Sequence, residues 1–192
     1  MNFLGHLYLS GNEPLVIVGN FMADAVKGRD LDRFDPLVQE GLRMHRAIDT
    51  FTDQHPLTLQ GRERLRAHTG KYAGVALDVF YDHVIAANWD DLHAEPLSDF
   101  AQRMYALLQA HADLMPERTQ RMLTYMVQHD WLTSYAQVEG IGRALNGLSY
   151  RAPGGEALRG AEQVLKEHYD AYRSEGLAFL RAMEQHLQGA AR

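Results

Sequence analysis

Residues 71–89 read KYAGVALDVFYDHVIAANW, and this stretch decides the fold class. Within residues 74–87 the ionisable groups other than tyrosine are Asp78, Asp82 and His83. Apolar residues lie on every side of the helix that the pattern predicts. A helix that is apolar all round is buried inside a protein. The stretch therefore predicts a central helix enclosed by other helices.

The rest of the chain has the same helical spacing of apolar residues, and no segment alternates as a strand would. Asp35-Pro36 supplies an N-cap and a first turn, and His55-Pro56 ends the helix that starts there. We expect helices at about 2–9, 13–27, 35–54, 57–68, 71–89, 97–114, 116–129, 131–148 and 155–187, with a possible kink at Gly176. Residues 29–35 and 149–155 are predicted loops. The prediction is an all-α, single-domain helical bundle over residues 1–192, with a long C-terminal helix.

Composition narrows the function. The 192 residues suit one domain, and 46% of them are hydrophobic. A net charge of −6 argues against a basic nucleic-acid-binding face. The absence of cysteine excludes disulfides, thiolate metal sites and a cysteine nucleophile. No apolar run approaches the ~20 residues of a membrane span, and the first residues lack the pattern of a signal peptide. We expect a cytoplasmic protein with no nucleic-acid or membrane partner.

Several acids and histidines stand inside apolar helical stretches. Asn20 and Asp24 are the polar side chains of residues 15–26, four apart on one face. In the helix predicted at 35–54, polar residues recur at the same spacing, at His45, Asp49 and Asp53. His6 lies alone among apolar neighbours. An ionised carboxylate buried without a partner costs several kcal/mol by order of magnitude. A bound divalent cation is the simplest common explanation, because helix bundles build metal sites from inward-facing carboxylates and imidazoles.

Each signal also has a purely structural interpretation. His6 alone fits a hydrogen-bonded core histidine. Asn20 with Asp24 fits a local hydrogen bond to a neighbouring helix, and His45 with Asp49 fits a surface pair. Asp78, Asp82 and His83 are harder to explain structurally, because their whole helix is predicted to be buried. The four sets together favour a metal site more than any one of them does.

Basic side chains are less specific. The cluster Arg62, Arg64, Arg66 and Lys71 fits either a solvated helix face or a docking patch for an acidic protein. Lys27, Arg46 and Arg151 fit either surface charges or phosphate ligands.

The sequence resembles the bacterial acyl carrier protein phosphodiesterases, also called acyl carrier protein hydrolyases. The matching segments follow the family's order over about the first three-quarters of the chain, and only in combination are they specific. They are NFLGHLYL at residues 2–9, Gly19-Asn20 with Asp24, HRAID at 45–49 with Thr52-Asp53, LDVFYDH at 77–83, and Leu145-Asn146-Gly147 with Arg151.

The resemblance implies hydrolysis of the phosphodiester that joins 4'-phosphopantetheine to the serine of holo-acyl carrier protein, by a metal-activated water. The expected metal is Mn²⁺, with Mg²⁺, Fe²⁺ or Zn²⁺ as alternatives. The family is similar to HD-type metal phosphohydrolases, so we expect an irregular HD-like core. In the matching segments the usual His-Asp doublet does not appear, and the adjacent pair is reversed, as Asp82-His83.

We assign each candidate residue an expected role on this basis. Metal ligands are expected at His6, Asp24, His45, Asp49, Asp82 and His83. Asn20, Asp53 and Asp78 are expected to orient those ligands. Asp82, His83 and Arg46 are the expected catalytic groups. Lys27 and Arg151 are expected to bind phosphate, and Arg62, Arg64, Arg66 and Lys71 to dock the carrier protein.

Three other functions stay open at this point. A related helical metal phosphohydrolase would act on a nucleotide or a small phosphodiester with the same metal residues. A non-catalytic helical protein would bind a carrier protein and would tolerate Asp82→Asn. A structural domain would pair its acids with arginines and would bind no stoichiometric metal.

Overall fold

The computed structural model describes residues 1–28, 31–151 and 153–190, and every regular element in these ranges is helical. This confirms the predicted all-α class. The α-helices are α1 Phe3–Leu9, α2 Pro14–Met22, α3 Pro36–Gln54, α4 Pro56–Thr69, α5 Ala73–Ala87, α6 Trp89–Leu92, α7 Leu97–Ala110, α8 Glu117–Gln128, α9 Trp131–Ser134, α10 Val138–Ser149, α11 Glu162–Glu167 and α12 Tyr169–Ala190. Short 3₁₀ segments are η1 Ala23–Ala25, η2 Gly70–Tyr72, η3 Ala112–Leu114 and η4 Gly155–Leu158.

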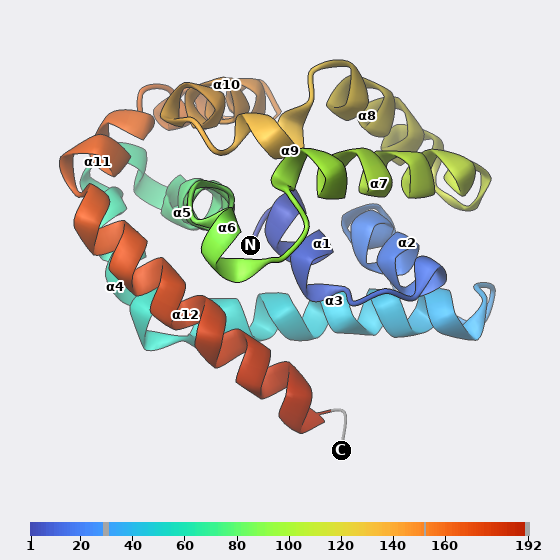
Figure 1. Ribbon diagram of the computed structural model, residues 1–192. Helices are drawn as coiled ribbons and strands as arrows, with labels where there is room; N and C mark the ends of the chain where they lie inside the picture. The colour runs from blue at the N-terminus through green and yellow to red at the C-terminus, as the bar shows by residue number, and fades with distance from the viewer. Residues whose placement is uncertain (29–30, 152, 191–192) are drawn as a thin grey trace.

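Helix α5 is the centre of the molecule, as its sequence predicts. It packs against α1, α4, α10 and α12 (Figure 1). Phe80 is fully buried and meets the Tyr172 ring edge-on at 5.1 Å, and Tyr81 stacks on Phe179 at 4.5 Å. Buried aromatic pairs of this kind contribute about 0.5–1.5 kcal/mol beyond the area they bury. Apolar contact on all sides therefore explains why α5 carries so few charges.

Helices α2 and α3 approach each other closely because each has a glycine at the crossing. A Cβ atom on Gly19 would lie 2.2 Å from the carbonyl oxygen of Val38, and one on Gly41 would lie 2.1 Å from that of Val16. Both distances are far inside van der Waals contact, so only glycine fits at these two positions. The crossing fixes Asn20, the residue after Gly19, beside the next turn of α3.

Local signals in the sequence explain the ends of α3 and α4. The Asp35 side chain accepts a hydrogen bond of 2.8 Å from the backbone N–H of Leu37, and proline occupies the first turn of each helix. Helix α3 ends at Gln54, one residue before His55, as predicted. Local sequence therefore sets where α3 ends and α4 begins.

The predicted C-terminal helix at 155–187 is wrong in its extent. The structure divides it into η4, α11 and α12, and Gly160 between η4 and α11 has a φ of +78°, which a right-handed helix cannot contain. Helix α12 then runs unbroken through Gly176. The stretches at 13–27, 71–89, 97–114 and 131–148 are likewise shared among shorter elements. The predicted loops at 29–35 and 149–155 include residues 29–30 and 152, which lie outside the described residues.

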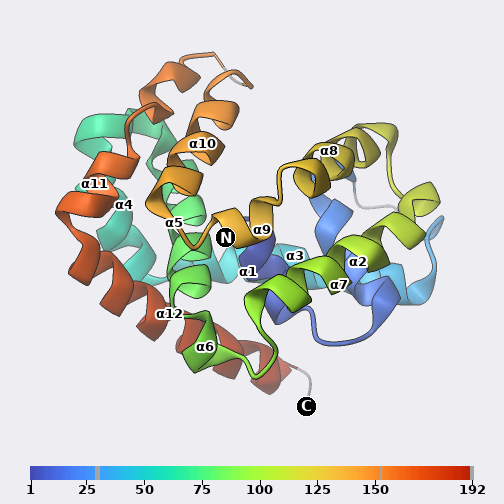
Figure 2. The ribbon, with the colours of Figure 1, turned by 45° about the horizontal axis from the view of Figure 1, so that its top comes forward.

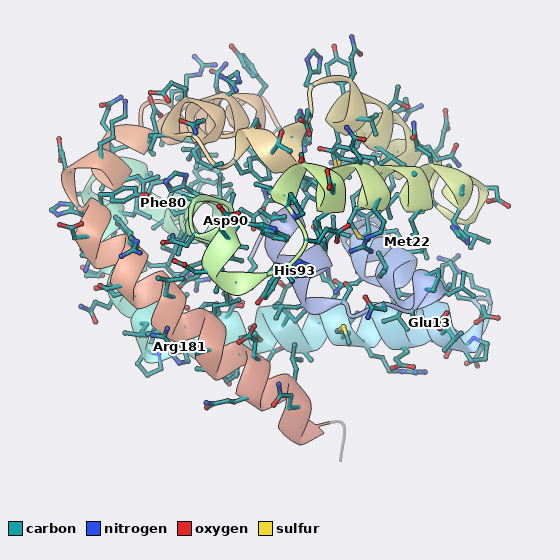
Figure 3. All side chains as sticks on the ribbon, viewed as in Figure 1. Glu13, Met22, Phe80, Asp90, His93 and Arg181 are labelled. Carbon is teal, nitrogen blue, oxygen red and sulfur yellow. The ribbon has the colours of Figure 1, made fainter. Side chains whose placement is uncertain are left out.

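Helix α9 lies between α8 and α10, close to the start of α1 (Figure 2). Figure 3 labels side chains of both kinds: Phe80 and Met22 are buried, whereas Glu13 and Arg181 are exposed. Among the described residues, no helix combines the length and the hydropathy needed to cross a lipid bilayer.

Candidate metal centre

Five of the predicted site residues come together from three parts of the chain. His6 comes from α1, Asn20 and Asp24 from α2 and η1, and His45 and Asp49 from α3. The two imidazole rings stack with their centroids 4.0 Å apart and their planes 16° apart. Both histidines and Asn20 are buried, Asp49 is half-buried and Asp24 is exposed. The cluster therefore has a buried nitrogen side and a carboxylate side open to solvent.

Asn20 fixes both imidazoles. Its side-chain oxygen lies 2.9 Å from Nδ1 of His6 and 3.0 Å from Nδ1 of His45. Its Nδ2 donates to the backbone oxygen of His6 and to Oγ of Ser10, at 3.2 and 2.8 Å, which sets the orientation of the amide. An amide oxygen can only accept, so each histidine donates from Nδ1. In a neutral imidazole that tautomer leaves a lone pair on Nε2.

Both Nε2 atoms point at carboxylate oxygens. Asp49 lies 3.2 Å from Nε2 of His6 through one oxygen and 3.2 Å from Nε2 of His45 through the other. Asp24 lies 3.3 Å from Nε2 of His45. The buried Nε2 of His6 has no partner with hydrogen-bond geometry. Because a lone pair facing a carboxylate is repulsive, this arrangement requires either added protons or a cation between the groups.

The electrostatics of the metal-free cluster agree with that requirement. Burial lowers the pKa of His45, but Asp24 and Asp49 outweigh it and raise this pKa to about 9. Burial raises the pKa of Asp49, but the two histidines hold it well below its usual range. His45 lowers the pKa of Asp24, and burial lowers that of His6. One proton on His45 therefore holds the cluster together when no metal is bound.

The cluster fits a divalent metal. One ligand atom each from His6, His45 and Asp49 lie within 4.8 Å of one another, so a single ion can reach all three. Two imidazoles and a carboxylate suit Mn²⁺, Fe²⁺ or Zn²⁺. A hydrogen bond to the far nitrogen of each imidazole, as Asn20 makes here, is the usual support of a ligating histidine. Asp24 stands next to these ligands as a further carboxylate.

Asp82 and His83 lie in a different environment. The Asp82 carboxylate is fully buried and accepts hydrogen bonds from the backbone N–H groups of Leu4, Gly5 and Asn2, at 2.8, 3.0 and 3.2 Å. Burial raises its pKa to about 7, and these bonds oppose the rise. Nδ1 of His83 donates to the backbone oxygen of Tyr135 at 2.8 Å. The structure thus places Asp82 as an anchor for the start of α1, and it does not place either side chain in the cluster.

Other predicted residues also lie apart from the cluster. Asp78 is 3.0 Å from the amino group of Met1. Asp53 forms an ion pair of 2.5 Å with an arginine of α4, and Arg46 donates to the backbone oxygen of Gly28 at 2.9 Å. Lys27 is exposed. Of these residues, only Asp78 lies near α1, and it contacts the chain before that helix.

The arginines predicted to dock a partner are paired within the molecule. Arg62 pairs with Asp53, Arg64 with Glu175 and Arg66 with Glu63. Lys71 lies over the ring of Tyr72. Because each arginine already has a carboxylate beside it, the positive potential of this face is weaker than its sequence suggests.

The cluster opens into cavities that the sequence did not indicate. A cavity of about 20 Å³ is lined by Met1, Asn2, Phe3, His6, Asn20, Phe21, Asp24 and His45. A larger one of about 500 Å³ shares Phe3, Phe21 and Asp24 with it and extends along α8. Phe3 is in the segment next to His6, but its place on the cavity wall depends on α8 and α9. No local pattern in the sequence could have shown this.

A search of protein families gives one that matches almost the whole chain. The family described as acyl carrier protein phosphodiesterase matches residues 1–183. The chain belongs to this family. Relatives named acyl carrier protein phosphodiesterase occur in Yersinia enterocolitica, at 33% identity over 98% of both chains. The Escherichia coli O6:H1 relative of that name is 36% identical over 96% of this chain and 97% of its own. No solved structure matches this member of the acyl carrier protein phosphodiesterase family.

Proposed function

We propose that this protein hydrolyses the phosphodiester of holo-acyl carrier protein. The reaction adds water across the bond between phosphorus and the serine oxygen: the hydroxyl goes to phosphorus and a proton goes to the serine oxygen, giving 4'-phosphopantetheine and apo-carrier protein. Two lines of support converge. The chain matches relatives named for this activity over nearly their whole length. The cluster supplies the metal ligands that phosphodiester hydrolysis commonly uses.

The observation that carries the proposal is the pair of imidazoles whose Nδ1 atoms share one amide oxygen. Their Nε2 atoms are thereby turned toward Asp49 and Asp24. We assign His6, His45 and Asp49 as the ligands of a divalent cation, most simply Mn²⁺. Such an ion polarises a phosphoryl oxygen and acidifies a bound water. An HD-like origin of the centre is part of the same proposal.

The chain's own groups then have definite tasks. Asn20 holds both histidines in the ligating tautomer. Asp24, exposed beside His45, receives the proton of the attacking water at its Oδ1. Arg151 lines the cavity that adjoins Asp24, and its guanidinium suits the phosphate oxygens. Arg46, held by the backbone oxygen of Gly28, keeps the segment after η1 next to α3.

The test is the mass of holo-acyl carrier protein after incubation with this protein and Mn²⁺, with and without a chelator. We expect the carrier to lose the mass of phosphopantetheine only when free metal is present. Asp49→Asn should slow the loss strongly, and Arg103→Gln, in an ion pair outside the cluster and the cavities, should leave it unchanged. A folded, metal-loaded protein that leaves the carrier intact but cleaves a small phosphodiester would replace this proposal with the broader phosphohydrolase activity.

A further inference from the structure

A second large cavity adjoins the candidate metal centre on the side of α9 and α10. It measures about 370 Å³, within the ~300–1,000 Å³ of small-molecule sites. Its lining consists of Asn2, Phe3, Tyr125, His129, Trp131, Ser134, Tyr135, Gly140, Arg143, Ala144, Gly147, Leu148 and Arg151. We call it the α10 cavity. Figure 2 shows the helices that enclose it, α10 and α9 with the start of α1 between them.

The α10 cavity is a neighbour of the centre. It shares Asn2 and Phe3 with the small cavity beside His6 and His45. The Phe3 ring lies 6.2 Å from that of Trp131 and 5.7 Å from that of Phe21, so it forms the wall where the cavities meet. A ligand with its phosphate at the centre would reach the α10 cavity by passing Phe3.

We propose that the α10 cavity binds the pantetheine arm of the substrate. This inference rests on the proposed function and adds the site that binds the pantetheine part of the substrate. The arm has a phosphate at one end, then a dimethylated carbon and two amides joined by methylene groups. A site for it needs cations near the phosphate, apolar walls along the chain and a few polar groups for the amides.

The lining of the α10 cavity meets these requirements. Phe3, Trp131 and Tyr135 provide aromatic walls, and Ser134 and His129 provide polar groups. Arg143 and Arg151 stand at the cavity as exposed cations. Among the ion pairs of the described residues neither arginine has a part, in contrast to the paired arginines of α4.

The sequence segment around residue 147 acquires a role in this way. Gly147 and Arg151 belong to one of the segments that resemble the family, yet neither is near the metal ligands in the chain. Both line the α10 cavity. A Cβ on Gly147 would have no heavy atom within 4 Å, so the glycine leaves open space there. A larger side chain can therefore be introduced at this position, on the lining of the α10 cavity, without a clash with the protein.

Gly147→Leu tests the proposal, because a leucine would occupy the cavity while favouring the helix. Gly189→Leu is the matched control: it is also an open, exposed glycine in a helix, on α12. Two substrates are compared, holo-carrier protein and carrier protein whose serine carries only phosphoethanolamine. We expect Gly147→Leu to lower kcat/KM for the holo form by about tenfold or more, as lost contacts to a remote group do. For the truncated substrate, Gly147→Leu should have the same kcat/KM as the unchanged protein.

The outcomes separate the inference from the function on which it rests. If the unchanged protein releases phosphopantetheine and Gly147→Leu cleaves the holo form equally well, the α10 cavity does not bind the arm. An equal loss on both substrates would also overturn the proposal, because the substitution would then act on the centre itself. If the unchanged protein cleaves neither substrate, the proposed function fails.

If the unchanged protein cleaves neither substrate, a binding measurement still tests whether the α10 cavity binds the arm. Trp131 lines the α10 cavity, and Trp89, the other tryptophan, is buried elsewhere. Free 4'-phosphopantetheine should change the fluorescence of Trp131 in the unchanged protein and in Gly189→Leu, and not in Gly147→Leu. No change in any of them would overturn the assignment.

Discussion

Two regions of this molecule contain acids and histidines in similar sequence patterns, but these side chains have different partners in the structure. The cluster of His6, Asn20, His45 and Asp49 has imidazole lone pairs directed at carboxylates. Asp82 accepts from backbone N–H groups, and His83 donates from Nδ1 to a backbone oxygen, while its buried Nε2 has no partner among the described residues and faces no carboxylate of theirs that forms an ion pair with it. The difference lies in the partner: backbone N–H groups satisfy Asp82, whereas the carboxylates of the cluster face imidazole nitrogens, which requires an added proton or a cation between them.

The comparison shows what makes a buried acid functional. A carboxylate whose oxygens already accept three N–H bonds has been stabilised by the fold and has little left to offer an ion. Two histidines held by one amide oxygen are stabilised on one side only. The carboxylates that converge on the Nε2 atoms, and not burial as such, therefore identify the candidate centre.

Matched Asp→Asn substitutions give the sharpest test, and the largest effect is expected at Asp49. Asp49→Asn removes a ligand charge, so we expect kcat to fall on the order of 10²–10³-fold. The carboxylate is 44% exposed, and water screens its ion pairs. The unfolding free energy of the chelator-treated protein should therefore change by less than about 1 kcal/mol. Turnover of holo-carrier protein and urea unfolding measure the two quantities. A large loss of stability with full activity would reverse the comparison.

Asp82→Asn should show the opposite pattern. At about pH 8 the carboxylate is ionised, because its pKa is about 7. Asparagine offers one acceptor oxygen to three N–H donors and points an amide N–H group at one of them. We expect a loss of about 2–3 kcal/mol of unfolding free energy. The folded fraction should bind as many metal ions per chain as the unchanged protein. Mass spectrometry of the eluted ion measures this metal content. Loss of metal without loss of stability would make Asp82 a ligand after all.

Asn20→Ala removes the amide that the two histidines share. Supporting groups of this kind typically contribute 10–100-fold to metal affinity, and we expect a weakening in that range. The measurement is a titration with Mn²⁺ against a competing chelator. Ser10→Ala is the control, since it removes only one partner of the same amide. Equal affinities in Asn20→Ala and the unchanged protein would mean that the histidines do not bind the ion through Nε2.

The smallest effect concerns pH. The pKa of His45 in the metal-free fold is about 9, above its unfolded value of 6.5. Its stabilising contribution is therefore complete below pH 6.5 and is lost as the pH rises through about 9. A metal ion must displace this proton, so its affinity should fall about tenfold per pH unit below about 9. Calorimetric titrations near pH 7 in buffers of different ionisation enthalpy should show about one proton released per ion. Binding without proton release would contradict the assignment of His45.

Local signals predicted the fold well, and contacts between distant segments limited the prediction. Asp35, Pro36 and Pro56 fix the ends of α3 and α4 through chemistry inside a few residues. Gly160 broke the last predicted helix, since a glycine inside an apolar pattern does not reveal its φ. The closeness of Gly19 and Gly41 also depends on two separate helices.

The candidate site was predicted in part for the same reason. Spacing placed His45 and Asp49 on one face, and the structure brings His6 and Asn20 to them. Nothing in the sequence distinguishes Asp82 from Asp49, because their difference is the set of atoms that face them. The carboxylates that pair with Arg62 and Arg64 lie 9 and 111 residues away along the chain. Pairing over such separations is invisible to a reading of local pattern.

Because Asp82 anchors α1 from a later part of the chain, the order of synthesis determines when α1 can be anchored. Asp82, which anchors the helix that carries His6, lies 77–80 residues later in the chain than the N–H groups from which it accepts. Until α5 emerges, α1 has no partner for its opening turn. A seven-residue helix is not stable in isolation. The segments of α2 and α3 are therefore made before the helix that carries His6 is anchored, and the proposed metal centre is complete only after α5 has been made.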